Sequence, residues 1–316
     1  MKTKYLINST FILLLSFSLI TFNSCRKDNV NESSNLGSFF DDNLTNAVQN
    51  FTINGSSWTE IIGSQGTKIL FGANSFQDAS GNVVTGKIDI ELVELLSIKD
   101  MILMDKPTTS NGRILTTGGE LNVNAFQNGQ KLSLTPNSYI DIKVPTDNPD
   151  NNMGLFLGVT DNKGDVDWLP ADTLGVTDSV IIINDSTVNG GWADYYYFDL
   201  YGALNLGWIN CDYFYNDPNP LTSLTVTPNN RHDNTNTQVW LHIATANSLM
   251  GTGWNGTSFI TSNIPETISV TIVALSEIGG NYFSSFTPIT VSNNHVENIT
   301  LSPTTTSQFL TDVNNL

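Results

Sequence analysis

The feature that most constrains the fold is a succession of short segments, from Phe51 onward, in which apolar and polar residues alternate. Segments such as Thr67–Phe71, Gly86–Val93 and Tyr139–Val144 place an apolar side chain at about every second position. That period is typical of a β-strand with one buried face. Turn-forming pairs such as Asn128-Gly129, which accept positive φ, lie between the segments. The pattern predicts an all-β protein built from sandwiches.

A second series of strands follows the turn-rich stretch Asp217–Pro220, which we interpret as a domain boundary. Thr305 and Gln308 form a capping box ahead of apolar residues at helical spacing, so a short C-terminal helix is expected. We therefore predict two β-sandwich domains, at residues 48–218 and 219–316, the first with an aromatic-rich extension. The second series consists of Leu224–Thr227, Gln238–Ala244, Ser258–Ile260, Ile268–Leu275, Tyr282–Phe286, Ile289–Val291 and Val296–Leu301, a number that suits an immunoglobulin-like or transthyretin-like sandwich.

The N-terminal residues have a different character from the rest of the chain. Lys2 and Lys4 give a basic start, and Leu6–Phe22 is an apolar stretch interrupted early by polar residues. The stretch is short for a permanent span of a hydrocarbon layer about 30 Å thick. Residues 1–24 are accordingly predicted to be a secretory signal peptide.

The end of this segment, Thr21-Phe-Asn-Ser-Cys25, resembles a bacterial lipobox, with Phe22 at a position where leucine is usual. The resemblance implies that Cys25 is acylated and becomes the first residue of the mature chain, which would attach the protein to a membrane through lipid. By analogy with lipoproteins, Arg26 after the cysteine implies the outer membrane, and leaves open whether the body faces the periplasm or the surface. Residues 25–47, which are rich in Asn, Ser and Asp, are predicted to be a flexible tether.

The charge balance excludes several classes of partner. The chain has 13 Lys and Arg against 30 Asp and Glu, a net charge of -17. Without residues 1–24, which hold two lysines and no acids, the net charge becomes -19. Residues 164–316 contain one basic residue, Arg231, and 14 acidic residues. Nucleic acid is therefore not an expected partner, whereas the acidic half could attract cations or basic molecules.

Several segments of the first domain together resemble the core of a ZU5-type β-sandwich, over about residues 65–200. The resemblance implies an interaction or structural module and brings no catalytic residues. It rests on Gly72–Phe76, Gly81–Gly86, Ile88–Glu94, Leu115–Glu120, Ala125–Leu132, the strand ending at Val144-Pro145, and the hairpin of Leu155–Val159 with Val166-Asp-Trp168.

Asp161, Asp165 and Asp167 form the densest group of carboxylates in the sequence. Alternating oxygen ligands of this kind occur in calcium loops, but an EF-hand loop starting at Asp161 would have Val166 where glycine is needed and Asp172 where a bidentate glutamate is needed. We favour a hairpin turn at Asp161–Gly164, and a weak calcium site stays open as the alternative. No cofactor is predicted.

Catalytic motifs are not found in the sequence. Cys211 has no histidine within twenty residues and is next to Asp212, which disfavours a thiolate, so we expect a buried structural thiol. The three histidines form no zinc-protease pattern, and there is no Gly-x-Ser-x-Gly elbow. The protein is therefore predicted not to be an enzyme.

Aromatic residues are the best candidates for binding. Flat rings beside Asn and Asp suit stacking on sugar rings or gripping a peptide. In a strand, Tyr195, Tyr197 and Asp199 would face one way while Tyr196, Phe198 and Leu200 face the other, so half of the run is expected to pack in the core. The candidate binding aromatics are Trp192, Tyr195, Tyr197, Trp208 and Trp254.

Together these observations predict a lipid-anchored cell-envelope protein with a non-enzymatic binding or structural role, and an envelope protein or a glycan as the partner. The alternative is an accessory glycan-active or proteolytic enzyme. Its carboxylates would converge only in the folded chain and would leave no local signature.

Overall fold

The structure is a computed structural model that describes residues 36–161, 165–176, 179–187, 189–201 and 206–316. The predicted signal peptide, Cys25 and residues 25–35 of the predicted tether lie outside the described residues. No helix within the described ranges is long and apolar enough to cross a membrane. The described residues belong to one compact unit.

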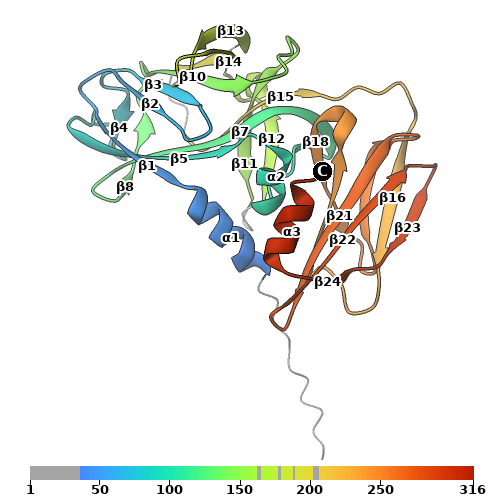
Figure 1. Ribbon diagram of the computed structural model, residues 1–316. Coiled ribbons are helices and arrows are strands. Elements are labelled where there is room, and N and C mark those ends of the chain that lie inside the picture. The colour runs from blue at the N-terminus through green and yellow to red at the C-terminus, as the bar shows by residue number, and fades with distance from the viewer. Residues whose placement is uncertain (1–35, 162–164, 177–178, 188, 202–205) are drawn as a thin grey trace, which may run out of the picture. The chain divides into compact units, whose positions relative to one another are not determined.

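Two sheets from the first part of the chain face each other (Figure 1). The larger has the order β1-β5-β7-β15-β11-β12, with β6 and β8 also paired to β7, and the smaller has the order β13-β14-β10-β3-β2. Between them lies a core of aliphatic and aromatic side chains that includes Ile69, Ile90, Ile142 and Phe198. The strands are β1 (Gln49–Asn54), β2 (Thr59–Ile62), β3 (Lys68–Phe71), β5 (Lys87–Leu95), β6 (Thr109–Ser110), β7 (Arg113–Gln127), β8 (Gln130–Lys131), β10 (Tyr139–Thr146), β11 (Gly154–Thr160), β12 (Val166–Pro170), β13 (Ile181–Ser186), β14 (Trp192–Tyr201) and β15 (Trp208–Phe214), while β4 (Phe76–Gln77) pairs with β9 (Ser133–Leu134).

Two further sheets come from the second part of the chain and enclose a second core, which includes Leu224, Leu241, Phe259 and Ile272. Their orders are β19-β20-β16-β23 and β18-β17-β21-β22-β24. The predicted segments Tyr282–Phe286 and Ile289–Val291 are one strand, because β22 continues through Pro288 beside β21. The strands are β16 (Leu221–Pro228), β17 (Thr237–Ile243), β18 (Ser248–Gly251), β19 (Gly253–Trp254), β20 (Phe259–Pro265), β21 (Ser269–Ile278), β22 (Asn281–Thr290), β23 (His295–Ile299) and β24 (Ser302–Thr304).

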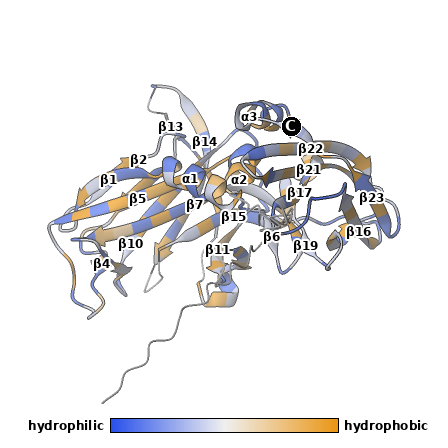
Figure 2. Ribbon diagram, turned by 90° about the horizontal axis from the view of Figure 1, so that it is seen from below, coloured by the Kyte–Doolittle hydropathy of each residue, from blue (hydrophilic) through white to orange (hydrophobic). Residues whose placement is uncertain are grey.

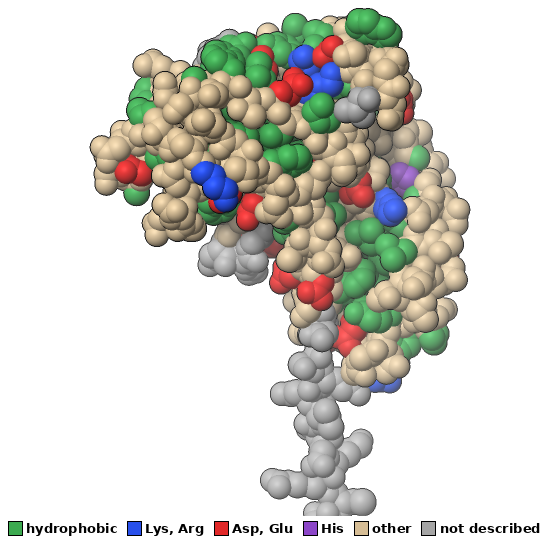
Figure 3. Space-filling model, turned by 60° about the vertical axis from the view of Figure 1, so that its left-hand side comes forward, with side chains coloured by type: hydrophobic (Ala, Val, Ile, Leu, Met, Phe, Trp, Pro, Cys, Tyr) green, Lys and Arg blue, Asp and Glu red, His purple; other side chains and the backbone are tan. Residues whose placement is uncertain are grey.

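The predicted all-β class with a short C-terminal helix is confirmed. Figure 2 shows apolar and polar bands along the strands, as the alternation of the sequence requires. The turn after β7 is also as expected, since Asn128 and Gly129 both have positive φ, at 51° and 76°. On the face drawn in Figure 3, basic side chains are few and scattered, in keeping with the acidic composition.

Three helices contribute to a third core that joins the outer face of β5 to the outer faces of β17 and β21. It contains Leu95 from the first sandwich and Trp240 and Val273 from the second, with Phe40 and Phe309 from two of the helices. Figure 1 shows the helices gathered between these sheets. They are α1 (Leu36–Ala47), α2 (Ile98–Leu103) and α3 (Thr306–Val313); short 3₁₀ turns occur at Ala171–Leu174 and Ala244–Ala246.

Helix α1 corrects one sequence-based prediction. Residues 36–47 were expected to belong to a flexible tether, but they form a helix of 12 residues. The physical reason is an apolar stripe, in which Leu36 and Phe40 are buried and Phe39 and Leu44 pack against the third core. The tether was predicted from the high content of Asn, Ser and Asp, which does not show that the apolar residues between them fall on one side of a helix.

Helix α3 begins where the sequence predicted. The hydroxyl of Thr305 accepts a hydrogen bond from the backbone N–H of Gln308 at 3.1 Å. The other half of the capping box does not form, because the side-chain amide of Gln308 instead donates to Asp312 at 2.8 Å. Phe309 and Val313 are buried on the inner side of the helix.

Candidate functional site

The outer face of the sheet β13-β14-β10-β3-β2, called here the outer B face, carries charged and aromatic side chains. In the strand register, Lys143 lies directly across from Lys68 on one neighbour and from Tyr197 on the other. The intervening residues point into the first core. Two like charges directly opposite each other in a sheet repel. A stable face therefore needs an anion between the two lysines.

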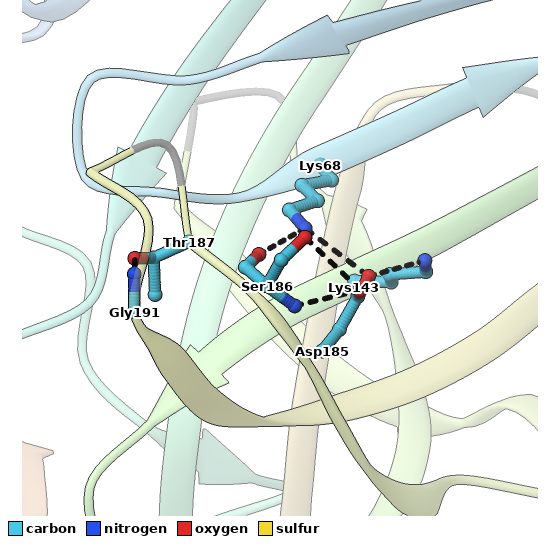
Figure 4. A network of polar contacts seen from close by, with 6 residues as sticks. All are labelled: Lys68, Lys143, Asp185, Ser186, Thr187 and Gly191. Carbon is cyan, nitrogen blue, oxygen red and sulfur yellow. Dashed lines mark hydrogen bonds and ion pairs between the residues drawn. The ribbon is translucent and has the colours of Figure 1, made fainter.

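Asp185 on β13 supplies that anion (Figure 4). Its Oδ2 accepts hydrogen bonds from Nζ of Lys143 at 2.7 Å and from Nζ of Lys68 at 3.1 Å. The ammonium of Lys68 also donates to the carbonyl of Ser186. Hydrogen bonds from Lys143 and Lys68 hold the pKa of Asp185 well below its usual range. The three charges are thus fixed in place and tie β13 to β10 and β3.

Tyr195 lies beneath this network. Nζ of Lys68 is 5.0 Å from the centre of its ring, within the range of a cation–π interaction. The side chain of Lys68 is almost buried, and Tyr195 is only 2% exposed. The prediction of Tyr195 as a ligand-contacting residue is therefore corrected, because the lysine covers the ring that would have to stack.

Two tyrosines and two aspartates form a second network on the outer B face. The hydroxyl of Tyr197 donates to Oδ1 of Asp199 at 2.6 Å, and Tyr139 is hydrogen bonded to Asp141. Asp141 and Asp199 are paired directly across β10 and β14, so their carboxyl groups are close neighbours on the outer B face. Two neighbouring carboxylates repel each other, which favours a proton on one of them. Burial and the carboxyl of Asp199 raise the pKa of Asp141 to about 6.

This network predicts a pH-dependent contribution to stability. The pKa of Asp141 is about 6 in the folded chain and 3.8 for an ordinary aspartate, so the folded state keeps a proton that the unfolded state releases between these values. The contribution is therefore complete below about pH 4 and is lost as the pH rises to about 6. We expect wild type to lose roughly 1–2 kcal/mol relative to Asp141→Asn over this range, as measured by urea unfolding. Asp165→Asn, at an exposed turn, serves as the control, and parallel curves for wild type and Asp141→Asn would contradict the raised pKa of Asp141.

Trp58 adds an exposed ring to the outer B face. It precedes β2 and is 59% exposed. Its ring centre lies 5.1 Å from that of Tyr139, with an angle of 58° between the planes. Since Tyr139 is hydrogen bonded to Asp141, the ring pair adjoins the carboxyl network directly. Sequence reasoning did not single out Trp58, which is isolated from the aromatic run.

The alternation predicted for the aromatic run is confirmed. Tyr196, Phe198 and Leu200 are in the first core, whereas Tyr197 is partly exposed on the outer B face. Trp192, the first residue of β14, is 74% exposed. Its side chain is on the same face of the strand as Tyr196, not on the face of Tyr197. It lies at the end of the strand, beyond the core. It is therefore open to solvent but is not part of the outer B face.

The other two candidate tryptophans lie elsewhere. Trp208 is half-buried on β15, edge-on to Trp168 at a ring distance of 6.3 Å. Trp254 is half-buried on β19 and packs edge-on against Phe259 at 4.9 Å. The structure thus does not gather the five candidate aromatics into one surface.

The carboxylates of Asp161, Asp165 and Asp167 lie at the hairpin between β11 and β12. Oδ1 of Asp161 accepts from the backbone N–H of Asp165 at 3.0 Å, and Oδ1 of Asp167 accepts from that of Asn111 at 2.9 Å. Residues 162–164, including the predicted turn residues Asn162 and Gly164, lie outside the described residues. Elsewhere in the described chain, as here, no three His, Cys, Asp or Glu side chains are grouped to hold a metal.

Cys211 is a buried free thiol, as predicted. Burial, together with the neighbouring Asp212, raises the pKa of its thiol well above the usual range. A thiol held in its neutral form is a poor nucleophile.

The geometry of the outer B face suits binding better than hydrolysis. Retaining glycosidases place their two carboxyl groups about 5–5.5 Å apart and inverting enzymes farther. Asp141 and Asp199 lie side by side on one face of a sheet, whereas the two carboxyl groups of a glycosidase flank the scissile bond. Fixed polar groups beside an exposed ring pair can instead hydrogen-bond and stack on a flat polar ligand.

Comparisons with known proteins give little further information. No family model matches the chain, and no curated protein matches its sequence. Among solved structures, a γ-cyclodextrin glucanotransferase of alkalophilic Bacillus clarkii aligns with 78% of this chain and 42% of its own length, at 11% identity and a TM-score of 0.20. The chain thus spans less than half of that enzyme, and a similarity at this level carries no argument about fold or activity.

Proposed function

We propose that this chain is an outer-membrane lipoprotein of the cell envelope, anchored through Cys25, whose body is a non-enzymatic binding module. We further propose that the first sandwich is ZU5-like and the second immunoglobulin-like or transthyretin-like. The lipobox-like sequence at 21–25 supports the anchor, and the sequence motifs of residues 65–200 support the ZU5-like assignment.

One observation carries the binding role: the exposed Trp58 ring and the ring of Tyr139 form a pair beside the carboxyl network of Asp141. The strands below fix this network, since Asp141 lies on the central strand β10, between β14 and β3. Little conformational entropy is then lost when a ligand binds. Aromatic faces next to hydroxyl and carboxyl groups favour a glycan as the ligand, because a sugar ring has apolar faces and hydroxyl edges.

The test is to screen the purified mature chain against a panel of envelope glycans and to compare Trp58→Ala with Trp192→Ala. Stacking on an aromatic side chain commonly contributes about 1–2 kcal/mol, so Trp58→Ala should weaken glycan binding by roughly 10-fold. Trp192→Ala removes an even more exposed tryptophan that lies off the outer B face, and should leave affinity unchanged.

Three results would count against the proposal. Equal losses in both variants would place the ligand elsewhere. Capture of an envelope protein without any glycan would change the ligand class. Turnover of a glycan that is abolished by Asp141→Asn would support the enzymatic alternative.

A further inference from the structure

Two acidic residues are completely buried on the face of the eight-stranded sheet that points away from the first core. Glu120 on β7 and Asp212 on β15 are each 0% exposed. Leu95, directly across from Glu120, belongs to the third core. The acids therefore lie where the first sandwich is covered by helices and by the second sandwich. They belong to a different sheet from the one that carries the outer B face.

A β-bulge brings the surrounding polar groups together. Glu120 pairs with Asn210, whereas Asp212 pairs with Thr117, so Gly118 and Gly119 both lie opposite Cys211. Residues three apart in a regular strand face opposite ways, but the extra residue places Thr117 and Glu120 on the same face. The site depends on both glycines, because Gly119 has a φ of 123° and a Cβ on Gly118 would lie 2.7 Å from the ring of Tyr196.

The hydrogen bonds within this group leave three oxygen atoms unused. Nδ2 of Asn210 donates to Oδ2 of Asp212 at 2.7 Å, and the hydroxyl of Thr117 lies 3.4 Å from Oδ1 of Asn210. Among the described residues, neither oxygen of Glu120 nor Oδ1 of Asp212 has a hydrogen-bond partner. Burying carboxyl oxygens without partners costs several kcal/mol per ion.

The lysine whose charge acts on Glu120, Lys106, does not satisfy these oxygens with a hydrogen bond. Nζ of Lys106 lies 5.8 Å from the ring centre of Trp208 and donates to the carbonyl of Asp105 at 3.4 Å. Its charge attracts Glu120 through space without a hydrogen bond. Burial, and for Glu120 also the charge of Asp212, raises the pKa of both acids well above the usual range. The pair must hold either protons or a cation.

We propose that Glu120, Asp212, Asn210 and Thr117 form a binding site for one calcium ion. They offer five oxygen atoms: two from Glu120, Oδ1 of Asp212, Oδ1 of Asn210 and the hydroxyl of Thr117. Calcium takes six to eight oxygen ligands, often with water among them, and two carboxylates neutralise its charge. A set without nitrogen or sulfur does not favour zinc or copper.

A cavity adjoins the bulge. Thr117 and Gly118 also line a polar cavity of about 800 Å³, whose wall includes Asp147 and Asp150. The two acidic residues favour a cation in this cavity, which adjoins the bulge at Thr117 and Gly118. The site would join strands β7 and β15 at the bulge, next to the second sandwich, because Nδ2 of Asn247 donates to the carbonyl of Thr117 at 2.7 Å.

The experiment measures calcium in the full mature chain by elemental analysis and by isothermal titration after EGTA treatment, together with thermal unfolding with and without calcium. We expect one calcium ion per chain and a rise of several degrees in Tm at millimolar calcium. Glu120→Gln and Asp212→Asn should each weaken calcium binding at least 10-fold. Glu94→Gln is the matched control: Glu94 is also buried, but it accepts hydrogen bonds from Gln65 and Thr67, so this variant should lower Tm and keep the calcium-dependent rise.

The results that overturn the proposal are distinct. If wild type binds no calcium and Glu120→Gln is as stable as wild type at pH 7, the acids are protonated and no cation is bound. In that case the stability of wild type should also rise as the pH falls, since the raised pKa values favour the folded state when protonated. Calcium binding that survives in both variants places the ion elsewhere. Absence of calcium binding by wild type is enough to overturn the proposal, so the test does not depend on whether the variants fold.

Discussion

Replacing Phe40 by alanine should lower the free energy of unfolding by about 3 kcal/mol, the low end of the range for buried phenylalanines. Phe40 is 9% exposed on α1, and its ring packs edge-on against Trp240 at 5.7 Å and against Phe39 at 5.4 Å. Removing it leaves a cavity between α1 and the second sandwich, and also loses the aromatic pairs. Chemical denaturation followed by tryptophan fluorescence measures the change, because Trp240 lies at the contact.

The matched control is Asn46→Ala, an exposed position on the same helix. It should change stability by no more than about 0.5 kcal/mol. If Phe40→Ala behaves like this control, α1 does not dock and residues 36–47 act as the tether that the sequence suggested. A large loss for Phe40→Ala alone shows instead that this segment closes the third core.

The strands were the most predictable part of the fold. The predicted segments Gly86–Val93 and Tyr139–Val144 correspond to β5 and β10, which extend to Leu95 and Thr146. Their alternation is a local signal, since each strand must present one apolar face to a core whatever its neighbours are. The turn at Asn128 was predictable for the same reason, because positive φ is a property of the residues themselves.

The helix α1 and the third core were not predictable in this way. An isolated helix of 12 residues is marginal in water, and α1 is held by contacts with Trp240 and Phe309, which are far away in the sequence. Single-sequence patterns show which side of an element is apolar, but they do not show that two sandwiches share a further apolar layer between them.

The candidate sites depend on strand order, which the sequence does not reveal. Alternation predicts that Tyr139, Asp141 and Lys143 share one face of a strand. It does not predict that Asp185, 117 residues after Lys68, lies beside both lysines. Glu120 and Asp212 were missed for a related reason, since each is the single acidic residue of its strand and only the bulge places them together.

The largest effect on location is expected for Cys25→Ala. If Cys25 is acylated, a metabolically supplied fatty-acid analogue should label wild type and should leave the variant unlabelled. The variant should also move from the membrane fraction to the soluble fraction. Without residues 1–24 the chain has a net charge of -19, so electrostatic attraction to anionic lipid cannot replace the lost acyl group.

The control is Cys211→Ser, which keeps Cys25 and changes the one other cysteine of the chain. It should retain the fatty-acid label and the membrane location, although loss of the buried thiol from the first core is expected to reduce stability modestly. Label that persists in Cys25→Ala would end the lipoprotein assignment. If Cys25→Ala loses the label but stays in the membrane fraction, the folded body binds the membrane or an anchored partner by itself. The outer B face would then be the first surface to mutate.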